Sequence, residues 1–170
     1  MTLVHISVLV IAGLACVSDL RTRRIPNVLT FGAAVAGVLF HLATSGMDGG
    51  VAGAGGWVVG VAMLLVPFVL GSMGAGDVKL LGALGAWLGP ADTLWLGLYT
   101  GIAGGALALV VAAGHGYLRQ AYRNIWLLLL YWRVSGVRPM AALTLESGNG
   151  PRLAYAAPIL VGTVATLWLR

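Results

Sequence analysis

Six long apolar stretches divide this chain, and they constrain its fold more than any other feature. They cover residues 3–18, 27–43, 51–70, 77–89, 93–113 and 153–169. A helix needs about 20 mainly apolar residues to cross a bilayer, with a range of about 17 to 25. Only 9% of the residues are charged, whereas soluble domains have about 25%. We therefore predict an all-α, polytopic membrane protein, a bundle of about six transmembrane helices that forms a single domain over residues 1–170.

The fourth stretch, residues 77–89, is shorter than a full crossing usually requires. As a helix it would cover on the order of 20 Å, and Pro90 ends it. Either the bilayer thins at this point or the helix begins below the headgroups, and a re-entrant segment is the alternative. The first stretch is expected to be a retained helix and not a signal peptide, because no Lys or Arg precedes it.

Basic residues predict the orientation of these helices. If residues 21–24 are cytoplasmic, nine of the ten Lys and Arg residues lie on that side, and Arg170 alone lies on the other. Cytoplasmic loops of membrane proteins carry an excess of Lys and Arg. We therefore expect both termini to be extracytoplasmic. The net charge of +5 is then a topology signal, and no nucleic-acid partner is expected.

The longest polar stretch covers residues 115–152 and contains one short apolar segment, Ile125 to Trp132. This segment is too short to cross a bilayer, and arginines and aromatic residues accompany it. Such a composition suits a segment that lies in the membrane interface, in contact with lipid. The alternative is a loop that folds against the bundle.

Two aspartates fall at the same predicted membrane boundary. Asp19 ends the first stretch and Asp77 begins the fourth, so both are expected at the cytoplasmic face. The other three acidic residues, Asp48, Asp92 and Glu146, fall in polar loops. Two carboxylates on separate helices can share one proton and act as general acid and general base. The alternatives are that Asp77 caps its helix and that Asp19 pairs with a nearby arginine.

Other chemistries have weaker support in the sequence. His5, His41 and His115 do not have the spacing of metal ligands, and Cys16 is the single cysteine. We therefore expect no metal and no cofactor. The glycine-rich segment at residues 71–76 lacks the Gly-Lys-Ser/Thr ending of a phosphate-binding loop. Pairs of glycines four residues apart indicate close helix packing, and they leave the oligomeric state open.

Two motifs in the first 90 residues resemble those of the prepilin peptidases of the type IV leader peptidase family. Asp19 is followed by a basic loop and then Ile-Pro-Asn, and residues 74–80 read Gly-Ala-Gly-Asp-Val-Lys-Leu, like the GxGD motif of these aspartic proteases. The resemblance implies that Asp19 and Asp77 are the catalytic pair. It also implies that Gly74, Gly76 and Lys79 belong to the active-site loop.

The same resemblance implies a reaction and a location. Members of the family cut the short, basic leader from prepilins or pseudopilins after a glycine, at the cytoplasmic face of the bacterial inner membrane. Bifunctional members also methylate the new N-terminus and carry paired CxxC motifs, which a chain with one cysteine lacks. We therefore expect the compact, Flp/Tad-type form without N-methyltransferase activity. Arg21, Arg23 and Arg24 would not attract a basic leader, so its recognition is expected elsewhere or through lipid headgroups.

A second function remains open at this point. A proton-coupled membrane transporter or a channel component could use the same two aspartates as proton sites. Many transporters contain two related halves. Residues 90–170 do not repeat either aspartate motif, and we find no acidic residue in the middle of a predicted span. A scaffold without catalytic activity is a third alternative, in which neutralising either aspartate would be harmless.

Overall fold

The computed structural model describes residues 2–136 and 154–170, and its regular structure is entirely helical within these residues. The five helices are α1 (Leu3–Thr22), α2 (Asn27–Val69), α3 (Ala75–Gly114), α4 (Leu118–Ser135) and α5 (Ala156–Leu169). α1, α2 and α3 are each long and apolar enough to cross a membrane. The predicted all-α membrane bundle is thus confirmed. Glu146 lies outside the described residues.

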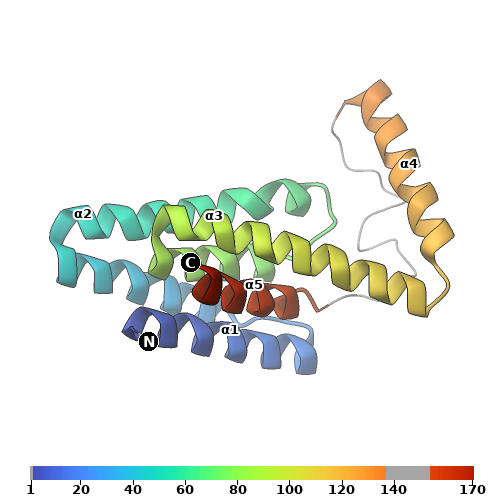
Figure 1. Cartoon of the computed structure of the whole chain (residues 1–170). Helices are drawn as coiled ribbons and strands as arrows, with labels where there is room; N and C mark the ends of the chain where they lie inside the picture. Colours follow the sequence, from blue (N-terminus) through green and yellow to red (C-terminus); the bar gives the residue numbers. More distant parts are fainter. Residues whose placement is uncertain (1, 137–153) are drawn as a thin grey trace.

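α2 and α3 are helical hairpins, each folded back on itself at one glycine (Figure 1). Gly46 has a φ of 65° and Gly89 a φ of 78°, a region that side-chain-bearing residues avoid. Pro90 then begins the second arm of α3, where its missing N–H leaves no helical hydrogen bond unmade. The four arms of the two hairpins correspond to the second, third, fourth and fifth apolar stretches of the sequence.

The helices are longer than the sequence pattern indicated. A loop was expected over residues 44–50, but Gly46 alone departs from helical geometry there. α2 also continues through Pro67 to Val69. α4 (Leu118–Ser135) extends on both sides of the short apolar segment Ile125 to Trp132. Within α2 and α3, only Gly46 and Gly89 thus have non-helical backbone angles.

The two hairpins pack against each other through glycines. A methyl group built on Gly60 would lie 2.6 Å from the carbonyl oxygen of Leu81, and one built on Gly56 would collide with the backbone of Gly85. In lipid, small residues favour helix association because they let the backbones approach closely. Gly56, Gly60 and Gly85 therefore serve as contacts within the chain.

Replacing Gly60 with alanine is expected to destabilise the protein by about 1–3 kcal/mol, because the added methyl group would overpack the α2–α3 contact. Gly101 provides the matched control, since a methyl group there would meet nothing within 4 Å. Thermal unfolding in detergent would compare the two variants. Equal melting temperatures for Gly60→Ala and Gly101→Ala would contradict the packing explanation.

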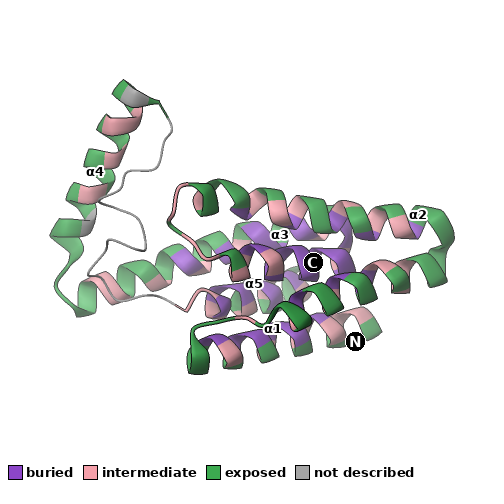
Figure 2. Ribbon diagram, turned by 180° about the vertical axis from the view of Figure 1, so that it is seen from behind, coloured by how far each residue is buried: buried purple, intermediate pink, exposed green. Residues whose placement is uncertain are grey.

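The first arm of α3 forms the centre of the bundle. Leu80, Leu81 and Leu84 are fully buried there, and Val8 of α1 and Ile159 of α5 pack in the same cluster. Figure 2 shows the buried residues gathered where α1, α3 and α5 meet. The short fourth stretch of the sequence is therefore a helix surrounded by protein, and this explains its many small and aliphatic residues.

The two ends of the bundle differ in what they carry. One end holds the connection from α1 to α2, the connection from α2 to α3, and the start of α5 (Figure 1). Both chain termini and the two glycine turns lie toward the opposite end. α4 leaves the bundle beyond the end of α3 and runs crosswise to the other helices. The end with the connections is where the two sequence motifs meet.

Candidate active site

Asp19 lies in the last turn of α1, and its residue is only 8% exposed. Its Oδ2 atom accepts a hydrogen bond of 3.4 Å from the backbone N–H of Ala156, the first residue of α5. A helix N-terminus carries unpaired N–H groups and the positive end of the helix dipole. α5 therefore stabilises a negative charge on Asp19, whereas the C-terminal end of its own helix would disfavour that charge.

The chain turns sharply after Asp19. Arg23 adopts a left-handed conformation with a φ of 54°, and its N–H donates to the carbonyl oxygen of Asp19 at 2.9 Å. The hydroxyl of Ser18 donates to the carbonyl of Arg24 at 2.9 Å, and that of Thr22 donates to the carbonyl of Ser18. These local bonds fix the basic loop against the end of α1 and direct the following residues toward α3.

Asp77 lies in the first turn of α3 and is partly buried. Its carboxylate accepts a hydrogen bond from the backbone N–H of Gly74, the residue that precedes the helix. A methyl group on Gly74 would lie 3.3 Å from Oδ2 of Asp77, so glycine at this position leaves the carboxylate room to fold back. Gly74, and not Asp77, is the N-cap residue of α3, and this helix start has no side-chain cap hydrogen bond.

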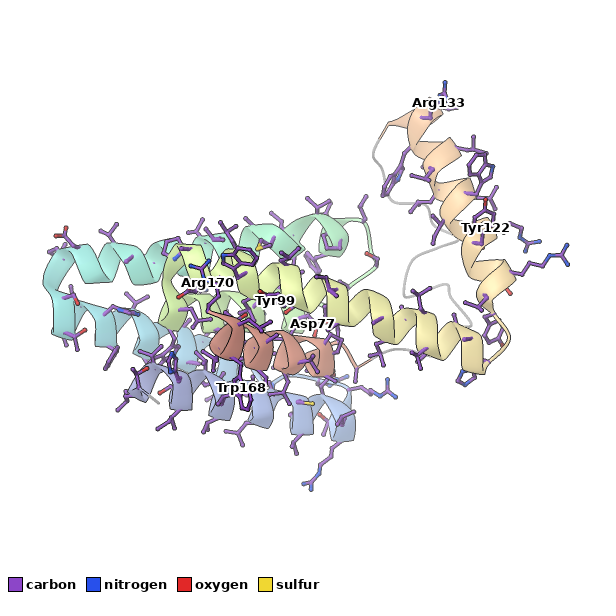
Figure 3. All side chains as sticks on the ribbon, in the orientation of Figure 1. Asp77, Tyr99, Tyr122, Arg133, Trp168 and Arg170 are labelled. Atoms are coloured by element: carbon purple, nitrogen blue, oxygen red, sulfur yellow. The ribbon has the colours of Figure 1, made fainter. Side chains whose placement is uncertain are left out.

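The fold brings Asp19 and Asp77 to the same end of the bundle from separate helices. The two carboxylates are close enough to interact electrostatically, and the hydroxyl of Tyr155 interacts with Asp77 in the same way. Figure 3 shows Asp77 in the bundle, near α5. Like charges at close range are unfavourable, and such pairs relieve the repulsion by holding one proton between them. The arrangement can therefore supply a proton acceptor and a proton donor together.

The two sequence motifs are joined by direct contacts. A methyl group on Gly76 would lie 3.3 Å from Cβ of Ile25, so Ile25 packs directly on the backbone at Gly76. Nζ of Lys79 donates a hydrogen bond of 3.1 Å to Oδ1 of Asn27 and lies 5.2 Å from the centre of the Phe31 ring. Gly76 and Lys79 thus connect the start of α3 to the Ile-Pro-Asn segment and to α2.

Replacing Lys79 with methionine is expected to lower the free energy of unfolding by about 1 kcal/mol, because the hydrogen bond to Asn27 is lost while the aliphatic stem is kept. The Asn27→Ala variant removes the same bond from the other side. A double-mutant cycle, measured by chemical unfolding in detergent, should show that the two changes are not additive. Strictly additive losses would show that this hydrogen bond contributes no coupling.

α5 is the part of the site that sequence reasoning missed. Tyr155 and Ala156 interact with Asp77 and Asp19, respectively, and the Tyr155 ring packs on Gly104, where a methyl group would lie 2.7 Å from its hydroxyl. The one sequence signal is in residues 152–158, which faintly resemble the final-helix motif of the prepilin peptidases, with Ala157 where that motif commonly has a glycine before the proline. A backbone N–H donor leaves no mark in the sequence, so only the fold could reveal the bond to Asp19.

The remaining polar candidates lie elsewhere. Asp92 forms an ion pair of 3.6 Å with Arg170, and Asp48 is exposed just after the Gly46 turn. His41 bonds to the carbonyl of Trp87 at 2.8 Å, close to the Gly89 turn. Across the part of the chain that the structure describes, no three His, Cys, Asp or Glu side chains gather as metal ligands would. The described acidic residues outside the pair thus lie away from it.

Comparison with known proteins assigns this arrangement to a family. The model of the type IV leader peptidase family matches residues 6–109, a span that contains Asp19, the Ile-Pro-Asn segment and Asp77. No curated protein and no solved structure matches the chain. The match covers more than half of the chain, and the apolar helices agree with a membrane location. The chain therefore belongs to the type IV leader peptidase family and is a membrane peptidase.

Proposed function

We propose that this protein is an aspartic endopeptidase that removes the short basic leader of Flp/Tad-like prepilins. Cleavage follows a glycine of the substrate and takes place at the cytoplasmic face of the bacterial inner membrane. One observation carries the proposal: Asp19 and Asp77 meet at one end of the bundle, each beside a helix N-terminus. The membership in the leader peptidase family supports the peptidase part of this assignment.

The proposed reaction uses the carboxyl pair with one shared proton. The ionised aspartate takes a proton from a water molecule, whose oxygen then attacks the scissile carbonyl carbon. The protonated aspartate donates its proton to the amide nitrogen as the C–N bond breaks. Each carboxylate accepts a hydrogen bond from a backbone N–H at a helix N-terminus, and such a donor can stabilise the negative charge of either aspartate. The two aspartates can therefore exchange the roles of acid and base, and the pair titrates as a unit.

The proposed orientation places the active-site end in the cytoplasm. Arg21, Arg24 and Lys79 come from the two motifs at this end, and both chain termini lie toward the other. Cytoplasmic loops contain an excess of Lys and Arg, so the positive-inside rule supports this orientation. A prepilin also presents its basic leader to the cytoplasm and its hydrophobic helix to the bilayer. Substrate and carboxyl pair would then meet at one membrane depth.

The proposal can be tested with a co-expressed substrate. A Flp/Tad-type prepilin, produced with this protein in a host that lacks other leader peptidases, is expected to lose its leader, as measured by intact-protein mass spectrometry. The mature N-terminus is expected to carry no added methyl group. Intact prepilin with the native chain present would contradict the proposed substrate. An added mass of one methyl group would contradict the monofunctional assignment.

A further inference from the structure

α4 (Leu118–Ser135) presents a large apolar surface that the bundle does not cover. Four side chains recur at helical spacing along one side and are all exposed: Leu118, Tyr122, Ile125 and Leu129. We call these four residues the apolar stripe. Residues three, four or seven apart lie on the same face of a helix. Figure 2 shows only exposed and intermediate residues along the described part of α4, and an apolar face of this kind requires a partner.

The charges on α4 are of one sign. Arg119, Arg123 and Arg133 are all exposed, and the helix contains no Asp or Glu. At 3.6 residues per turn, the three arginines fall on one side, next to the apolar stripe. Arginines beside an apolar face can extend their side chains to charged headgroups while the face enters the apolar region. The pattern therefore complements a negatively charged lipid surface.

The position of α4 agrees with such a surface. Only residues 115–117 separate α3 from α4, which lies at the end of the bundle that carries the Asp19 and Asp77 carboxyl pair. α4 runs crosswise to the other helices (Figure 1). Figure 3 shows Tyr122 and Arg133 on this helix, well away from the bundle that contains Asp77. α1, α2 and α3 are long and apolar enough to cross the bilayer, so a helix that runs crosswise to them would lie along the membrane plane. The short connection also keeps it at a high effective concentration near that surface.

We propose that α4 binds the surface of an anionic bilayer at the active-site end of the protein. The apolar stripe enters the boundary between headgroups and acyl chains, and the three arginines contact anionic headgroups. The lipid holds the helix in the membrane plane, because only there does the apolar stripe enter an apolar environment while the arginines stay at the headgroups. This inference is independent of the proposed peptidase chemistry, since it concerns no residue of the carboxyl pair.

Single spin labels can test this proposal in the full chain. Cys16 is the only cysteine and is buried, so a Cys16→Ala background allows one new cysteine at a time. Labels at Ile125 and Leu129 report on the apolar stripe. A label at Gln120, an exposed residue on the side opposite Leu129, is the matched control. Each labelled protein is placed in nanodiscs of phosphatidylglycerol and phosphatidylcholine, and in nanodiscs of phosphatidylcholine alone.

The expected result is a difference between the two faces of α4. With phosphatidylglycerol, collisions with oxygen should dominate at positions 125 and 129, and collisions with a water-soluble nickel chelate should dominate at position 120. Equal nickel accessibility at all three positions would overturn the proposal, because α4 would then lie in water. Equal shielding of all three positions would also overturn it, because α4 would then be covered by protein.

A separate variant tests whether the arginines of α4 contribute to lipid binding. Changing Arg119, Arg123 and Arg133 to glutamine leaves the apolar stripe intact. At about fivefold per basic residue, the ratio of bound to free α4 should fall on the order of a hundredfold in phosphatidylglycerol nanodiscs. Positions 125 and 129 would then gain nickel accessibility. Unchanged insertion of this variant, or equal insertion of the native sequence in both lipid compositions, would overturn the role of anionic lipid.

Discussion

Replacing Asp77 with asparagine is expected to abolish prepilin cleavage while the protein remains folded in the membrane. Asparagine has nearly the same shape, and its carbonyl oxygen can still accept the hydrogen bond from the Gly74 N–H. It cannot take up or release the proton that the reaction transfers. General acid–base catalysis contributes roughly 10²–10⁴-fold to a rate, so cleavage should fall at least about a hundredfold.

Asp19→Asn is expected to produce the same loss for the same reason. Its Oδ1 can still accept the Ala156 N–H, so the contact between α1 and α5 is preserved. The variant that changes both aspartates should be no less active than either single variant, because residues that act as one catalytic unit are not additive. The rate of leader removal, followed by mass spectrometry in membranes, would measure all three variants.

Asp48→Asn is the matched control for this series. Asp48 is exposed and follows the Gly46 turn, so it has no part in the carboxyl pair. Its replacement should leave cleavage unchanged, and the melting temperatures of all variants should stay close to that of the native chain. Cleavage at the native rate by either Asp19→Asn or Asp77→Asn would refute the paired mechanism.

Much of the fold could be predicted from the apolar pattern. A membrane span has a minimum length and must satisfy its own backbone hydrogen bonds, so six apolar stretches already limited the chain to a helical bundle. The pairing of the arms could not be predicted in this way. It depends on which glycines face one another, such as Gly56 and Gly85, and pairs with the same spacing occur elsewhere in the chain. The predicted helix ends near Gly46 and Gly89 were also inexact, because in each hairpin a single glycine makes the turn.

The part of the candidate site that consists of the two aspartate side chains could be predicted from the sequence. Asp19 and Asp77 could be assigned to one predicted membrane boundary by counting spans, and in the structure both lie at one end of the bundle. The contribution of α5 was not predictable, since it consists of a backbone N–H and of a tyrosine from a distant part of the chain. The contact of Lys79 with Asn27 was missed for a similar reason. Sequence spacing does not reveal which elements pack together at the end of a bundle.

The Gly76–Ile25 contact leads to the second large expected effect, because it is the place where the two motifs touch. A valine at position 76 would push Ile25 away, since even its Cβ would lie 3.3 Å from Cβ of Ile25. Ile25 follows the basic loop after Asp19, and Asp77 follows Gly76, so the displacement would alter the spacing of the two carboxylates. A misplacement of about 1 Å can reduce catalysis on the order of a hundredfold.

We therefore expect Gly76→Val to lose about a hundredfold in cleavage rate, with both aspartates still present. Adding Ile25→Ala to Gly76→Val removes the side chain that the valine displaces, so the double variant should regain much of the activity. Ile25→Ala alone serves as a control for the lost packing, and Gly101→Val tests the effect of a valine at a glycine with nothing within 4 Å. If the double variant stays as inactive as Gly76→Val, position 76 acts on the reaction directly and does not act through Ile25.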